Sequence, residues 1–549
     1  MAKFISPFRS TFVSLHRFIV EYARTYNALS LRSVVVQIDT FFDDRKNEMS
    51  MPEMKQSKLP VFRDRVPEWL RFPLLLVMPF IYQCSNPLYM NIASQVASDP
   101  VSGLTDMALR EVDVLMCGFA CILGITVTFP VLFRLKFRFT TRQILLICSS
   151  AIIALALLAE HVRLLPVLVA VCFVFGVFKV WGTFECMSSM MQILTPNMHL
   201  APFLTVVFLA VFGGVELGGL ASTAISHYYT WHYVTYALVG VHLLVILFAL
   251  LLLRDFRFQP KVPLHGIDWT GMVLWSVFLT GLVALFVYGE TLEWFHSPSL
   301  VVCLGVSLIA LGMNIYRMHH IEQPFIAPQC FGYRNLWPIM VLFFVSGVML
   351  SSQTVLQGAL TGGVMHVPPI VGVRLNWAIL AGVVLGCYVG RWGLTGLGWG
   401  YKQLTGLSIL VTAMYAAALY FLVSRGASMG RLVLPCFFSG VGHALIFVVL
   451  TTYVESSTPF EHRFMMLTIL GLVRTGVASP IGNALFGHLL RYDLLRGMTL
   501  ESSLRDGYGL TVMLGVVTLV ILLASRFDDK RYITLPTLRK IHQSLSRMR

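Results

Sequence analysis

Long apolar stretches recur along the chain and are separated by short polar ones. Ile144–Ala159 and Val234–Leu253, for example, contain no acidic residue, lysine or arginine. A helix of about 20 such residues crosses the hydrocarbon core of a bilayer, so the pattern predicts an all-α integral membrane protein with fourteen transmembrane helices. Their expected positions are 72–94, 113–133, 143–160, 165–192, 202–226, 232–253, 269–289, 299–317, 336–359, 371–391, 404–424, 431–454, 465–490 and 507–525.

The composition agrees with this pattern. Of 549 residues, 56% are hydrophobic and 12% are charged, whereas soluble domains carry about 25% charged residues. The apolar stretches are too numerous for a single anchor or a cleaved signal peptide. The ten cysteines fall mostly inside these stretches and none shows a CxxC spacing, so we expect free thiols, with no disulfide framework and no metal cluster.

The net charge of +14 is concentrated in particular loops. This distribution indicates membrane orientation rather than a nucleic-acid partner. Because short cytoplasmic loops are rich in lysine and arginine, we expect both termini in the cytoplasm of a plasma or inner membrane. The basic residues counted are Arg134, Lys136, Arg138, Arg142, Arg254, Arg257, Lys261, Arg526, Lys530, Arg531, Arg539, Lys540, Arg547 and Arg549, while alternate loops carry Asp99, Asp106, Glu290 and Glu293.

The chain contains no P-loop, HExxH or strand-borne GxSxG motif, so we expect neither an attached ATPase nor an enzyme, and no cofactor. Only residues 1–70 form an extramembrane stretch long enough for a domain. This stretch is interpreted as a cytoplasmic segment lying on the membrane surface. Met51 and Met54 each begin a shorter chain that runs directly into the first span, so a start-site artefact is the alternative for residues 1–50.

Ionisable residues inside the spans are few, and each is costly to bury. Glu216 lies among four glycines in 213–219 and is the first candidate for a proton-carrying carboxylate. Lys179 and Glu185 are six residues apart in span four and do not share a helix face, so each needs a partner elsewhere. Arg474 in span thirteen is expected to pair with Glu216 or Glu455, or to reach a membrane face.

Amide and basic side chains near span centres or ends are further candidates for ligand binding. Pro87 is expected to kink the first span and to expose its polar groups. Three single histidines, His242, His443 and His488, are interpreted as structural. The candidates are Asn86, Asn91, Gln353, Gln357 and Arg374, whose alternative role is to bond neighbouring helices.

Several segments resemble the fourteen-span drug:proton antiporter branch of the major facilitator superfamily, of EmrB/QacA type. Gly214-Val215-Glu216-Leu217-Gly218-Gly219 is similar to its span-five motif, with Val215 in place of proline. The resemblance covers residues 70 to 530 as an ordered set. Its other members are Thr230-Trp231-His232-Tyr233, Asp268-Trp269-Thr270-Gly271, Glu293-Trp294-Phe295, Glu322-Gln323-Pro324-Phe325 and Phe331-Gly332-Tyr333-Arg334-Asn335.

The chain departs from this family at its usual coupling residues. The acid of the first span is Asn86 here, whereas Asn91 is retained. The loop after span two keeps basic charge but lacks the family's aspartate and glycines, and Lys179 stands for the arginine of span four. We therefore expect Glu185 and Glu216 to take over proton coupling.

The resemblance implies a fold of two six-helix bundles around a central site, with two helices inserted between them. It divides the chain into an N-terminal segment 1–70, a bundle 71–254, an insert 255–335, a bundle 336–526 and a basic tail 527–549. It implies proton-coupled efflux of amphipathic small molecules, together with a periplasmic adaptor and an outer-membrane channel in a two-membrane host. The alternatives are a lipid, siderophore or metabolite carrier of the same fold without proton coupling and, with least support, a membrane enzyme or sensor.

Overall fold

The structure is a computed structural model that describes residues 61–97, 109–162, 164–194, 201–256, 264, 267–333, 336–423, 428–458, 460–525 and 527. Most of the predicted N-terminal segment, the tail beyond Phe527 and the two aspartates of the first loop lie outside the described residues. Arg257, Lys261, Arg334 and Asn335 do so as well.

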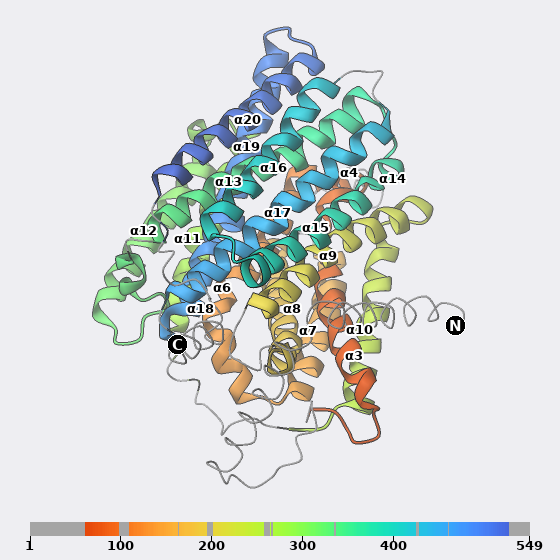
Figure 1. Cartoon of the computed structure of the whole chain (residues 1–549), viewed down its shortest axis with the longest axis vertical. Coiled ribbons are helices and arrows are strands. Elements are labelled where there is room, and N and C mark those ends of the chain that lie inside the picture. The colour runs from red at the N-terminus through yellow and green to blue at the C-terminus, as the bar shows by residue number, and fades with distance from the viewer. Residues whose placement is uncertain are drawn as a thin grey trace, which may run out of the picture. The chain divides into compact units, whose positions relative to one another are not determined.

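The described residues fold almost entirely into helices (Figure 1). An isolated β-bridge joins Phe62 to Leu253. The helices are α3 (Glu68–Cys84), η1 (Met90–Ile92), α4 (Ala93–Ala97), α6 (Glu111–Arg138), α7 (Thr141–His161), α8 (Leu165–Leu194), α9 (Ala201–Tyr228), α10 (His232–Leu252), α11 (Trp269–Tyr288), η2 (Trp294–His296), α12 (Pro298–His320), η3 (Pro328–Gly332), α13 (Trp337–Gly358), η5 (Ala359–Val364), α14 (Pro369–Gly372), α15 (Leu375–Trp392), η6 (Gly393–Leu397), α16 (Tyr401–Leu422), α17 (Met429–Ser457), α18 (Phe460–Gly471), η7 (Leu472–Ala478), α19 (Ser479–Leu495) and α20 (Leu500–Ala524).

Thirteen described helical segments are long and apolar enough to cross a bilayer. They coincide with the second to fourteenth predicted spans, and α3 stands at the place of the first. The chain is therefore a multi-pass membrane protein, as the hydropathy pattern predicted. Three of the spans contain π-helical turns, namely η5, η6 and η7.

The first span differs from its expected range, because α3 ends at Cys84 instead of continuing to residue 94. Pro87 lacks a backbone N–H and disfavours helical geometry in the residue before it, Asn86. Ser85, which follows α3, is already extended. The expected kink is thus a complete break, and the chain resumes only in the short helices η1 and α4.

The spans pack as two sets of six. In the first set, α8 packs against α3, α6 and α7, while α9 packs against α3 and α10 packs against α7. In the second set, α17 packs against α15 and α16, and α20 packs against α13, α16 and α19. Contacts between the sets are made by α9 with α15 and α17, and by α6 with α18 and η7 (Figure 1). The domain boundaries at residues 254 and 335 stay predictions.

The two helices between these sets form a hairpin. Helix α12 packs on α11, and α11 also contacts α6 and α19. Asp268, the first residue of the Asp-Trp-x-Gly segment, caps α11, because its carboxylate accepts a hydrogen bond from the Gly271 amide. The same carboxylate lies 2.7 Å from Arg317 at the end of α12. The ion pair thus closes the hairpin.

Each set contains a helix crossing at which two glycines face each other's backbone. A Cβ atom built on Gly124 of α6 would lie 2.0 Å from the carbonyl oxygen of Phe173 in α8, and one on Gly176 would lie 2.0 Å from that of Cys121. In the second set, a Cβ on Gly382 of α15 would lie 2.2 Å from the carbonyl oxygen of Phe437 in α17. One on Gly440 would lie 2.2 Å from that of Ile379. Small residues allow such backbone contact in lipid, where van der Waals packing drives helix association.

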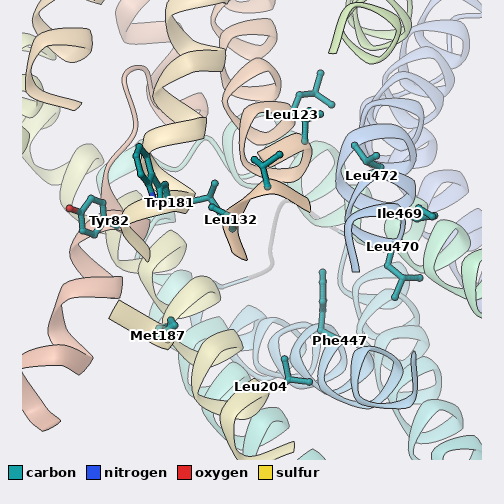
Figure 2. Close-up of a cluster of buried hydrophobic side chains, with 14 of the residues drawn as sticks. Tyr82, Leu123, Leu132, Trp181, Met187, Leu204, Phe447, Ile469, Leu470 and Leu472 are labelled. Atoms are coloured by element: carbon teal, nitrogen blue, oxygen red, sulfur yellow. The ribbon is translucent and has the colours of Figure 1, made fainter. Parts of the chain in front are cut away.

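The largest buried cluster draws side chains from both sets. Figure 2 shows Tyr82, Trp181 and Leu204 from the first set together with Phe447 and Leu470 from the second. All are at most 9% exposed. The region between the two sets is therefore filled with side chains at this level, and the polar residues described next are embedded in it.

Candidate functional site

Lys179 is buried near the middle of α8 and bonds to the broken end of the first span. Its Nζ atom donates to Oδ1 of Asn86 at 2.8 Å and to the carbonyl oxygen of Gln83 at 3.1 Å. The side chain of Gln83 donates to Thr183, one turn further along α8. Because α3 stops at Cys84, these polar groups are free to receive the ammonium. The structure thus brings together Asn86 and Lys179, the residues standing for the family's first-span acid and span-four arginine.

Glu216 lies near the middle of α9, where this helix meets both sets. A Cβ on Gly214 would lie 2.5 Å from Cβ of Gln83, and one on Gly218 would lie 2.8 Å from the carbonyl oxygen of Cys84. These glycines let α9 approach the end of α3. A Cβ on Gly219 would lie 3.1 Å from the amide nitrogen of Asn376 in the second set. The span-five motif therefore fits α9 between its two neighbours.

The carboxylate of Glu216 makes no hydrogen bond or ion pair with the described residues. The thiol of Cys436 in α17 lies within electrostatic range of it, and the same thiol hydrogen-bonds to Gln357. Glu216 is partly buried, and no cation pairs with it among the described residues.

The amide candidates are held by neighbouring helices. Asn91 donates to the carbonyl oxygen of Gly219 at 3.0 Å and to Thr223 at 2.6 Å, so it fixes η1 to α9. Oε1 of Gln353 accepts from Ser439 at 2.6 Å, and Oε1 of Gln357 accepts from Tyr415 at 3.2 Å. Both glutamines thus line the side of α13 that faces α16 and α17.

Two candidates lie apart from this group. Glu185 accepts a hydrogen bond from Thr141 at 2.5 Å and forms an ion pair of 3.3 Å with Lys136, at the end where α6 turns into α7. Arg374 is exposed at the start of α15, and its side chain makes no hydrogen bond or ion pair with the described residues. Glu185 and Glu216 therefore have separate sets of neighbours.

Arg474 is 4% exposed and lies in the π-helical segment η7. Its guanidinium carbon sits 3.5 Å from the centre of the Phe447 ring. Its Nε atom has no hydrogen-bond partner. Neither expected acid pairs with it within the described residues, since Glu455 pairs instead with Arg463 at 3.2 Å. The expected ion pair of Arg474 is thus replaced by a contact with an aromatic ring.

Sequence reasoning missed the aromatic group around Arg474. The centroid of the Phe212 ring of α9 lies 4.3 Å from that of the His443 ring and 4.8 Å from that of the Phe447 ring. Phe208 and Phe343 also face Phe447, at 5.2 and 5.4 Å. Phenylalanine is abundant throughout the spans, so no local signal distinguished these residues.

The chain is similar in sequence to known exporters. The multidrug export protein EmrB of Escherichia coli (strain K12) is 25% identical over 303 residues, which make up 53% of this chain and 55% of that protein. The probable multidrug resistance protein EmrY of the same strain is 24% identical over 292 residues, or 51% of this chain and 53% of that protein. The chain thus spans about half the length of the relatives it matches. No family model matches it.

Solved transporter structures share its architecture. A POT family peptide transporter in complex with alafosfalin aligns over 86% of this chain and 99% of its own, with a TM-score of 0.56 and 16% identity. The human organic anion transporter MFSD10 (TETRAN) aligns over 83% of this chain and all of its own, with a TM-score of 0.51 and 11% identity. The fold is that of a major facilitator transporter. The predicted fold class is therefore confirmed, and α9 meets α15 and α17 where the two sets contact each other.

Proposed function

We propose that the chain is a secondary transporter that exports amphipathic small molecules in exchange for protons. The observation that carries this proposal is Glu216, an acid near the middle of a span, between the two helix sets, with no hydrogen-bond or ion-pair partner among the described residues. An acid in this setting can bind a proton when substrate leaves and release it when access changes sides. The similarity to multidrug export proteins supports the direction of transport.

Glu185 has a second place in this proposal. Its ion pair with Lys136 joins α8 to α6 close to the turn before α7. We assign it to the closure of this end of the molecule, where protonation of the carboxylate would release Lys136. When the two sets separate, the polar groups of the substrate would contact the remaining candidates, namely Gln353, Gln357, Asn91 and Arg374.

The basic loops support a plasma or inner membrane location with both termini in the cytoplasm. In a host with two membranes, a periplasmic adaptor and an outer-membrane channel would continue the export route.

Transport is tested in everted membrane vesicles with a matched pair of fluorescent probes, 1-pyrenebutyrate and (1-pyrenylmethyl)trimethylammonium. An imposed proton gradient should drive uptake of at least one probe, and a protonophore should abolish it. Glu216→Gln should reduce the gradient-driven part of probe uptake at least tenfold. Wild-type transport by both Glu216→Gln and Glu185→Gln would show the coupling mechanism to be wrong.

One observation favours a carrier without proton coupling. Asn86 is neutral where the family has an acid, and it accepts from Lys179 in a fixed hydrogen bond. A lipid, siderophore or metabolite carrier would need no proton at this position. Downhill flux that persists unchanged with a protonophore would support this second function over the first.

A further inference from the structure

We propose that Arg474, with His443, Phe447 and Phe212, binds the acidic group of an amphipathic aromatic carboxylate. The proposal rests on the transport function above and names its substrate class. It places a site for an organic anion around Phe447 of α17, which both Phe212 of α9 and Arg474 of η7 contact.

The first argument is charge. Arginine stays protonated in proteins, and a charge without a partner near the centre of a span is costly. Arg474 has no acid within reach among the described residues. Lys179, the other buried cation near a span centre, bonds only to neutral oxygens there. Glu185 and Glu455 already have cations of their own.

Glu216 is the one acid near the centre of a described span that has no cation of its own and could balance these two positive charges. Protonation of Glu216 would leave two positive charges, and its ionisation would leave one. In both states the central region therefore carries net positive charge, which an anionic ligand neutralises and a cationic ligand increases.

The second argument is the geometry around Arg474. Its guanidinium carbon lies over the Phe447 ring, 3.5 Å from the ring centroid, and its Nε atom is buried without a partner. Nε2 of His443 is a second buried nitrogen without a partner. Phe212 packs on both His443 and Phe447. Two unsatisfied nitrogens beside aromatic rings fit a carboxylate joined to a flat apolar body.

The local backbone is built to admit this arginine. A Cβ on Gly347 of α13 would lie 3.0 Å from Cγ of Arg474, so a larger residue there would press on the side chain. The wide turn of η7 interrupts the regular helix at the same position. Such π-helical turns are frequent at functional sites.

The test is equilibrium binding of the two pyrene probes to full-length protein in phosphatidylcholine nanodiscs, without a gradient. Wild-type protein should bind 1-pyrenebutyrate at least tenfold more tightly than (1-pyrenylmethyl)trimethylammonium. Arg474→Gln should lose at least tenfold in affinity for the carboxylate, and Arg474→Lys should keep part of it. Arg391→Gln, which removes the same charge from an exposed position of α15, should bind both probes like wild type.

Two results would overturn the site. One is equal carboxylate affinity in wild type and Arg474→Gln, with both proteins folded by their melting curves. The other is a wild-type preference for the quaternary ammonium probe. Should Arg474→Gln fail to fold, Phe447→Leu is compared with wild type instead, and its affinity for 1-pyrenebutyrate should be at least threefold lower. Arg474-dependent binding without gradient-driven flux would refute the transport function and leave the site standing.

Discussion

The ammonium of Lys179 donates to the amide oxygen of Asn86 over 2.8 Å, across the gap left by the broken first span. This bond ties α8 to the segment after α3, and both residues stand at positions where the resemblance implies a charged residue. A neutral acceptor holds the cation without cancelling its charge. The N-terminal set therefore keeps a positive centre.

Removal of the Asn86 acceptor should destabilise the fold. In Asn86→Leu, Lys179 loses its side-chain partner while staying buried, which should cost about 2 kcal/mol, in the usual range for a hydrogen bond to a charged group. The check is the free energy of unfolding in mixed micelles. Asn483→Leu, which removes an acceptor from the neutral hydroxyl of Thr354, should cost clearly less; equal losses would mean that the charge of Lys179 is irrelevant.

The ion pair of Glu185 should act as a unit with Lys136. Glu185→Leu removes the negative charge that faces Lys136 in this largely buried pair and should destabilise the protein by about 3 kcal/mol. The double variant Glu185→Leu, Lys136→Met should recover most of this loss, because no uncompensated charge remains. A double-mutant cycle measures the coupling, and strict additivity of the single changes would argue against the pair.

The close helix crossings should tolerate no side chain. Gly124→Val places atoms against the carbonyl oxygen of Phe173 and should destabilise by about 3 kcal/mol, the upper range for overpacking. Gly240→Val is the matched control, because a Cβ on Gly240 of α10 meets nothing within 4 Å. Thermal melting of the two purified variants should separate them widely; indistinguishable melting curves would mean that the crossing relaxes freely.

The link between the loop after α11 and α19 should weaken in acid. Glu290 lies 2.9 Å from His488 and 3.5 Å from Arg491. Burial opposes ionisation of Glu290, but the His488 hydrogen bond and the charge of Arg491 outweigh it and lower the pKa of the carboxyl. A lowered folded-state pKa gives stability that is present above the unfolded value of about 4.3 and is lost as pH falls through the folded value.

Melting temperatures measured between pH 6 and pH 3 should reveal this contribution of Glu290. Wild type should lose more stability than Glu290→Gln over the lower half of this range, where the wild-type carboxyl becomes protonated. Parallel curves for the two proteins would count against a role of Glu290 in acid sensitivity.

The spans were predictable because hydrocarbon imposes length and apolarity on every crossing helix. The pairing of Lys179 with Asn86 was within reach, since the resemblance aligned both residues with family positions. The contact of Arg474 with the Phe447 ring could not be predicted, because the 3.5 Å distance from its guanidinium carbon to the ring centroid depends on how α17 and η7 pack. The partner of Glu185 could not be named for a similar reason: Lys136 was assigned to a basic loop by sequence, whereas α6 continues as a helix to Arg138.

The two glycine crossings repeat one contact in two places. In both, each glycine faces the carbonyl of the residue three positions before the opposing glycine, and the partners are the second and fourth helices of their set. An equivalent contact in both sets is what an internal structural repeat would give. The two sets can therefore be compared position by position: the effect of a substitution on stability at Gly176 predicts the effect of the same substitution at Gly440.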